Sequence, residues 1–246
     1  MRPTAGVRTR APLLLSATAL AILAGSVTTG PAPAGGTSTV ARSQELAVFV
    51  RGQTAMSKPD NDSARRAWVE RKRPITEGRT VLPVIGHRTG AKGVRWLQVR
   101  LPGRPNNSTG WIRKARTRQS ATTWQVVVDL SDRRVTVYRR GRVVRSFSAV
   151  VGAPSTPTPR GRFFVEETVR LRASDVGAPY ALALSARSYV LQEFAGGPGQ
   201  IAVHGVWNVG GTMGTAASHG CVRLDTASIR WLGERIGPGV PITIVS

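Results

Sequence analysis

Cysteine and acidic residues are scarce in this chain. Its 246 residues include a single cysteine, Cys221, so no disulfide can form within the chain. Asp and Glu number 13 against 35 Lys and Arg, and the formal charge is +22. No internal repeat or heptad pattern occurs, and the apolar run at residues 11–27 is short for a stable transmembrane span. These absences exclude a disulfide scaffold and a coiled coil, and they leave one unpaired thiol to be explained.

The excess of basic over acidic residues is uneven along the chain. Residues 1–120 carry 21 Lys or Arg against 5 Asp or Glu, whereas residues 121–246 carry 14 against 8. A surface of this kind attracts polyanions, which would be nucleic acid inside a cell and anionic envelope polymers outside it. The alternative is that the positive charge reflects only a compositional bias of the sequence, because Arg outnumbers Lys 31 to 4. For an exported protein we predict no nucleic-acid partner and a contact between the basic N-terminal half and anionic cell-wall polymers.

The N-terminus has the features of a secretory signal. Arg2, Arg8 and Arg10 precede the apolar run, and the small residues at 32–34 have the spacing of a cleavage site. The sequence predicts a signal peptide at residues 1–34, followed by a linker at 35–45. We expect an exported protein of the cell envelope or extracellular space, with an uncleaved signal acting as a membrane anchor as the alternative. No cysteine lies near this segment, which excludes a lipid-modified N-terminus.

After the signal, the chain is mainly β. Short β-branched or aromatic runs alternate with Gly, Pro and Asn turns, a pattern typical of small barrels and sandwiches. The sequence predicts a small β-domain at residues 46–115, a linker at 116–123 and a second β-rich domain at 124–246. One helix is expected after the cysteine motif, with Asp225 or Thr226 as its cap. The expected strands lie at residues 80–85, 96–101, 110–112, 124–130, 134–138, 143–148, 163–166, 180–184, 201–203 and 240–245.

Two histidines lie close to the single thiol in sequence. Cys221 lies in the run Ser218-His219-Gly220-Cys221, and a second His-Gly pair, His204-Gly205, lies upstream. A thiol attacks as its thiolate, and a neighbouring imidazole lowers its pKa below the ordinary value of ~8.5. We therefore predict a nucleophile and its base, the alternative being a buried cysteine that acts as a small hydrophobe. No Asp or Glu lies between residues 200 and 224, so we predict no metal and no cofactor.

The motif around the thiol resembles a known family. His204-Gly205, Met213-Gly214 and the run SHGCVRL at residues 218–224 look like the signature of the L,D-transpeptidase (YkuD) family. The resemblance covers residues 124–246. Residues 96–112 also resemble the C-terminal half of bacterial SH3-like modules, although the charged stretch 60–73 matches poorly. The implied fold is a β-rich catalytic domain with one or two short helices, preceded by a small SH3-like β-domain.

The resemblance implies roles for the residues of the motif. Cys221 would be the nucleophile that forms a thioester with a peptidoglycan stem peptide, and His204 would be its general base. The backbone carbonyl of Gly205 would orient the imidazole. The oxyanion hole would be formed by the backbone N–H groups of His219, Gly220 and Cys221.

The sequence also suggests roles for five side chains in and near the motif. His219 would either tune the thiolate or hold its loop by hydrogen bonds. Ser218 would order the same loop beside the substrate. Arg223 would pair with a substrate carboxylate or, alternatively, form a structural ion pair with Asp225 or Glu234. The resemblance also places Trp207 and Asn208 at the border of the substrate cleft.

The expected activity is formation of 3-3 crosslinks between peptidoglycan stem peptides, with carbapenem-type β-lactams as inhibitors that acylate the same thiol. Two alternatives stay open: an L,D-carboxypeptidase that hydrolyses the same thioester, and a non-catalytic cell-wall-binding protein. Other cysteine enzymes fit less well. Envelope Cys/His endopeptidases have a histidine after the cysteine, and none follows Cys221. The TLxTC-like motif of sortases is absent.

Overall fold

The computed structural model describes residues 40–193 and 196–246. The signal peptide predicted at residues 1–34 lies outside this part of the chain. Within it, no helix is both long and apolar enough to cross a bilayer. Residues 39–246 form one compact unit that contains two large sheets. The mainly-β prediction is confirmed, since the described residues contain one α-helix among seventeen strands.

The first sheet has seven strands in the order β3-β2-β6-β5-β4-β1-β7. It encloses an apolar cluster that includes Phe49, Leu82, Leu97 and Ile112. All six pairings are antiparallel, and three of them join strands that are neighbours in sequence, as the short runs and turns predict. Their bounds are β1 (Gln44–Phe49), β2 (Gln53–Met56), β3 (Arg65–Val69), β4 (Val81–Thr89), β5 (Arg95–Arg100), β6 (Thr109–Arg113) and β7 (Thr117–Thr122).

The predicted linkers differ from the structure in two places. Residues 117–122 form strand β7, which pairs antiparallel with β1 along its whole length, although the sequence predicted a linker there. Strand β1 also begins at Gln44, inside the other predicted linker. Both polar segments become strands because each supplies the other with backbone hydrogen-bond partners, which local composition does not encode. The charged stretch that matched poorly contains strand β3.

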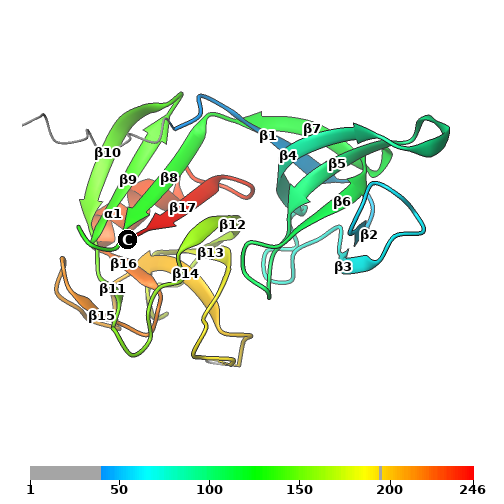
Figure 1. Ribbon diagram of the computed structural model, residues 1–246. Helices are drawn as coiled ribbons and strands as arrows, with labels where there is room; N and C mark the ends of the chain where they lie inside the picture. Colours follow the sequence, from blue (N-terminus) through cyan, green and yellow to red (C-terminus); the bar gives the residue numbers. More distant parts are fainter. Residues whose placement is uncertain (1–39, 194–195) are drawn as a thin grey trace, which may run out of the picture. The chain divides into compact units, whose positions relative to one another are not determined.

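The second sheet has eight strands in the order β10-β9-β8-β17-β12-β13-β14-β16. The last strand of the chain, β17, lies in its middle between β8 and β12 (Figure 1). Strands β11 and β15 pair separately. The bounds are β8 (Trp124–Asp129), β9 (Arg134–Arg139), β10 (Arg142–Ser148), β11 (Val151–Gly152), β12 (Gly161–Arg170), β13 (Tyr180–Arg187), β14 (Gln200–Gly205), β15 (Ala216–Ser218), β16 (Val222–Leu224) and β17 (Pro241–Val245).

Helix α1 (Thr226–Gly233) covers the core of the second sheet. Asp225 caps it as predicted, because its side chain accepts a hydrogen bond from the Ser228 N–H. The apolar positions of the helix, Ile229 and Leu232, are fully buried in the same cluster as Val203, Val222 and Leu224. The helix therefore packs against the strands that carry the two candidate catalytic residues.

Strand β12 joins the two sheets. Phe163 lies in the core of the second sheet, whereas its neighbour Phe164 lies in the core of the first. Successive strand residues point to opposite faces, so one strand can supply both cores. Between Val165 and Glu167 the pairing of β12 with β13 shifts its register, and the two consecutive glutamates are both buried.

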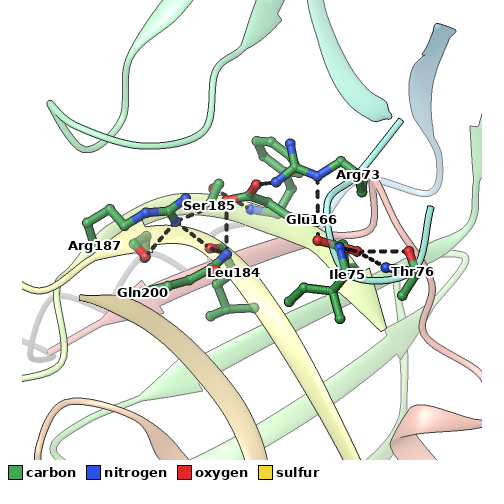
Figure 2. A network of polar contacts seen from close by, with 11 residues as sticks. Arg73, Ile75, Thr76, Glu166, Leu184, Ser185, Arg187 and Gln200 are labelled. Carbon is green, nitrogen blue, oxygen red and sulfur yellow. Dashed lines mark hydrogen bonds and ion pairs between the residues drawn. The ribbon is translucent and has the colours of Figure 1, made fainter. Parts of the chain in front are cut away.

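The buried glutamates bind the first half of the chain to the second (Figure 2). Glu166 pairs with Arg73 and, at 3.0 Å, with Arg187, and accepts a hydrogen bond from Gln200 at 3.1 Å. Glu167 accepts hydrogen bonds from the backbone N–H groups of Ile75 and Thr76. Burial lowers the pKa of Arg187 to about 10, so its guanidinium stays charged at neutral pH. Charges buried this far from water are held only when they are paired, as they are here.

Candidate active site

The parallel pairing of β14 with β16 brings the two candidate catalytic residues together. Its register sets Val203 opposite Val222 and His204 opposite Arg223. Val203 and Val222 point into the core, and the alternation of a strand turns His204 and Arg223 to the other face. Cys221 directly precedes β16, and from the same alternation we infer that its side chain lies on the face of His204. The thiol also receives a hydrogen bond from the Ala202 backbone.

The imidazole of His204 is held in one orientation. Its Nδ1 lies 2.7 Å from the carbonyl oxygen of Gly205. Because a carbonyl oxygen only accepts hydrogen bonds, Nδ1 carries the proton and the lone pair of the neutral ring lies on Nε2. Burial lowers the pKa of His204, the Gly205 carbonyl opposes this, and the positive charge of Arg223 adds to the lowering. The ring is therefore neutral at pH 7 and can accept a proton at Nε2.

The thiol of Cys221 is neutral in the same state. Burial raises its pKa above the ordinary value, and the Ala202 hydrogen bond and the charge of Arg223 only partly oppose this. The expectation of a thiolate stabilised by the neighbouring imidazole is therefore wrong for the structure without substrate. The physical reason is desolvation, which disfavours the charged form of both groups. The pair suits general-base catalysis, in which His204 takes the thiol proton as the bond to substrate forms.

The turn before the nucleophile is closed by Ser218. Its hydroxyl donates to the Cys221 carbonyl at 2.5 Å and accepts from the Gly220 N–H at 3.1 Å. Gly220 has φ +112, a conformation that side chains disfavour, and a Cβ there would lie 3.0 Å from Ile201. The Gly220 N–H, expected to line an oxyanion hole, is used within the turn. The N–H groups of His219 and Cys221 stay predicted donors.

The proline-rich connection after β11 supports this turn from outside. Thr158 Oγ1 donates to the Gly220 carbonyl at 2.8 Å and accepts from the Gly152 N–H at 2.9 Å. Thr156 Oγ1 donates to the Ser218 carbonyl at 3.0 Å. The sequence alone assigned no role to either threonine. The available signal was their position beside prolines, which fix the backbone and so aim the hydroxyls.

Arg223 is 8% exposed and has no carboxylate partner among the described residues. Its Nη1 donates to the Gly210 carbonyl at 3.2 Å, and its Nε is buried without a partner. The predicted ion pair is wrong, because Asp225 caps helix α1 and Glu234 pairs with Arg235. A positive charge next to the thiol is therefore left uncompensated, which suits it to an anionic group of a ligand.

Trp207 and Asn208 point to another segment. Trp207 Nε1 donates to the Ala173 carbonyl at 2.8 Å, and Asn208 Nδ2 donates to the Ser174 carbonyl at 3.2 Å. Their polar groups thus hold the β12–β13 connection, and the place of both residues at the border of a substrate cleft stays a prediction. His219 is exposed, unlike the half-buried His204, and its supporting role stays a prediction. Within the described residues, no group of three or more His, Cys, Asp or Glu is arranged to hold a metal ion.

Comparison with known proteins gives one matching family model, the L,D-transpeptidase catalytic domain (YkuD), over residues 123–244. L,D-transpeptidase 1 of Mycobacterium tuberculosis is 32% identical over 127 residues, covering 48% of this chain and 49% of its own. The putative L,D-transpeptidase YkuD of Bacillus licheniformis is 28% identical over 121 residues, covering 49% of this chain and 65% of its own.

Among solved structures, the LD transpeptidase LdtMt1 in complex with imipenem has a TM-score of 0.43 at 19% identity, covering 85% of this chain and 88% of its own. The chain spans about half the length of the first curated relative.

Proposed function

Residues 123–244 belong to the YkuD family of L,D-transpeptidase catalytic domains, and from this we propose that the chain is a cysteine acyltransferase that joins peptidoglycan stem peptides by 3-3 crosslinks. The observation that carries the proposal is the register of β14 and β16, with Cys221 and His204 on one face and Nδ1 of the imidazole held by the Gly205 carbonyl. A nucleophile, an oriented base and a nearby cation are the groups that acyl transfer needs.

In the first half-reaction, His204 Nε2 removes the proton of the Cys221 thiol as sulfur attacks a carbonyl carbon of the donor stem. That carbonyl belongs to the diamino acid at the third position of a tetrapeptide. The tetrahedral intermediate collapses when the bond to the terminal D-alanine breaks, and the imidazolium gives its proton to the leaving amine. The products are a thioester on Cys221 and free D-alanine.

In the second half-reaction, the side-chain amine of another stem attacks the thioester. His204 takes a proton from the amine, the carbon–sulfur bond breaks, and the thiol is restored with that proton. The crosslink then joins two third-position residues. If water attacked the thioester in place of the amine, the same site would act as an L,D-carboxypeptidase, so the products must be identified directly.

The surroundings of Arg223 support a donor stem peptide that carries a carboxylate. Its guanidinium is buried on the face of His204 and Cys221, and its Nε has no partner among the described residues. A buried donor without a partner costs free energy, which a carboxylate ligand would recover. We propose that Arg223 receives the carboxylate of the donor stem and thereby aligns the scissile carbonyl with the thiol.

Localisation and wall contact are proposed on the same basis. A substrate made of stem peptides requires an exported enzyme, in agreement with the signal-like sequence of residues 1–34. The basic N-terminal half would add affinity for anionic wall polymers, and salt would weaken this contact because exposed charges are screened.

Mass spectrometry of the products tests the proposed activity. The full chain and its Cys221→Ala variant are incubated with a defined tetrapeptide stem at a concentration where it serves as donor and acceptor. The wild type should release D-alanine and give a 3-3 dimer, and the variant should give neither. Released D-alanine with no dimer would identify the carboxypeptidase, and no product from folded, reduced wild type would refute the proposed activity.

Imipenem gives an independent test of the thiol. Because the chain has one cysteine, intact mass after exposure reports acylation of Cys221 without any peptide mapping. We expect a single adduct on the wild type and none on Cys221→Ala. Absence of an adduct on the wild type would show that the site is not competent for acyl transfer to sulfur.

A further inference from the structure

The connection between β12 and β13, residues 171–179, is tied to the segment that follows His204. Two ties come from side chains: the indole of Trp207 donates to the Ala173 carbonyl and the amide of Asn208 to the Ser174 carbonyl. Two are between backbones, from the Gly177 N–H to the Trp207 carbonyl and from the Gly205 N–H to the Gly177 carbonyl, both at 2.8 Å. Four hydrogen bonds therefore hold this connection against the end of β14.

Gly177 lies directly against the imidazole. A Cβ at this position would be 2.6 Å from Nδ1 of His204 and 2.9 Å from its Cγ. The residue also has φ +83, which side chains rarely adopt. The backbone of Gly177 thus occupies the space beside the Nδ1 edge of the ring, where any side chain would push the ring aside.

We propose that residues 171–179, tied down by Trp207 and Asn208, fix the orientation and tautomer of His204. Gly177 closes the Nδ1 edge of the ring and, through its carbonyl, holds the Gly205 N–H, while the Gly205 carbonyl accepts the Nδ1 proton. Only Nε2 is then left to exchange a proton with Cys221. Gly177, Trp207 and Asn208 are positioning residues in this account. The significance of these three residues for catalysis rests on the proposed function. Their effect on the orientation of the His204 ring does not depend on that function.

The test compares two glycines with similar backbones. Gly103 has φ +88, and a Cβ there would meet no atom within 4 Å. Gly177→Ala and Gly103→Ala therefore carry similar backbone strain, but only the first pushes on His204. The readouts are the ¹⁵N chemical shifts of the His204 ring, which identify the protonated nitrogen, and the rate at which iodoacetamide alkylates Cys221 at neutral pH. His204→Gln gives the rate without the base.

We expect the wild type and Gly103→Ala to show a proton on Nδ1 and alkylation rates within about twofold of each other. Gly177→Ala should lose this tautomer preference and slow toward His204→Gln, since misplacement of a reacting group by 1 Å can cost on the order of 100-fold in rate. A folded Gly177→Ala that keeps the wild-type tautomer and rate would overturn the proposal.

Trp207→Phe provides a second test, which introduces no backbone strain. It removes the indole N–H that holds the Ala173 carbonyl, and its control is Trp68→Phe, another exposed tryptophan whose indole bonds Glu70 in the first sheet. We expect a several-fold slower alkylation and a mixed tautomer for Trp207→Phe alone. If Gly177→Ala does not fold, an unchanged tautomer and rate in Trp207→Phe would by itself overturn the proposal.

These readouts separate this inference from the proposed activity. Neither ring shifts nor alkylation involves peptidoglycan. Changes in both, together with a wild type that makes no dimer, would support the positioning of His204 and refute the crosslinking. A wild type that makes the dimer, together with a Gly177→Ala variant whose ring shifts and alkylation rate are unchanged, would support the crosslinking and refute the positioning of His204.

Discussion

At the scale of single residues, the site depends on two groups that burial keeps neutral. Burial raises the pKa of Cys221 and lowers that of His204, so both shifts oppose an ion pair before substrate arrives. In the proposed mechanism, proton transfer from sulfur to Nε2 then belongs to the step in which the bond to carbon forms. The uncompensated charge of Arg223 assists ionisation of the thiol but opposes protonation of the ring.

The pH dependence of acylation follows from these directions. Neutral His204 is needed as the base, and its pKa lies below 6.5, so the rate of imipenem acylation should rise with pH only below that value. The rate should then stay level until the thiol itself ionises above pH 9.0. His204→Gln should lose the level region and keep only the alkaline rise. Stopped-flow acylation rates over pH 5–10 would check this, and ultraviolet absorbance of a thiolate at pH 7 would contradict it.

At the scale of elements, the nucleophile is positioned by a loop that contributes no reacting group. The connection after β11 carries two threonines between prolines, and their hydroxyls hold two carbonyls of the turn before Cys221. Proline fixes the backbone of this connection, so the hydroxyls are aimed before substrate binds. The turn thus keeps a Gly220 conformation that residues with a side chain rarely adopt, and neighbouring elements hold it in place.

Thr158→Val tests this support. The change keeps the shape of the side chain but leaves the Gly220 carbonyl and the Gly152 N–H without their partner, at a cost of about 1–3 kcal/mol in unfolding free energy. Acylation by imipenem should slow as well. Thr136→Val is the matched control, since Thr136 bonds only the exposed Ser146 hydroxyl and should cost about 0.5 kcal/mol or less. Urea unfolding measures both. Equal stability of the two variants would show that Thr158 does not hold the turn.

At the scale of the whole molecule, the first sheet and the second are joined by buried charges and a shared strand. Glu166 is paired with arginines from both halves of the chain, and Phe164 lies in the core of the first sheet although it belongs to a strand of the second. Residues 40–246 should therefore unfold together, because separation would expose a buried carboxylate and an aromatic ring to water.

Glu166→Gln tests this joint. It leaves Arg187 buried without a counter-charge and Arg73 with only the more distant Glu167, and removal of one partner of a buried pair costs about 3–5 kcal/mol. The control is Glu77→Gln, which breaks an exposed pair with Lys72 and should cost about 0.5 kcal/mol or less. Denaturant unfolding measures the loss of unfolding free energy in each variant. Calorimetry should show a single unfolding transition in each protein. Two separate transitions in the wild type would contradict a common folding unit.

Most of the second sheet could be predicted from the sequence, because strand alternation and helix capping are local. The strands of residues 124–148, the Asp225 cap and the closing strand agree with their expected places. Strand β7 could not be predicted, since its polar residues become a strand only by pairing with β1. The hydrogen bonds of Trp207 and Asn208 could not be predicted for a similar reason, because their partners lie 34 residues away in the chain.

The sequence by itself determined the candidates for the reaction: one cysteine, two nearby histidines and a motif whose residue types suit acyl transfer to sulfur. Only the tertiary structure decided their protonation, since the burial that shifts the pKa of Cys221 and of His204 arises only when segments distant in sequence pack together. It also decided which nitrogen of His204 is left to accept a proton, through the Gly205 carbonyl and the backbone of Gly177. Chemical identity is local, whereas desolvation and orientation are properties of the packed chain.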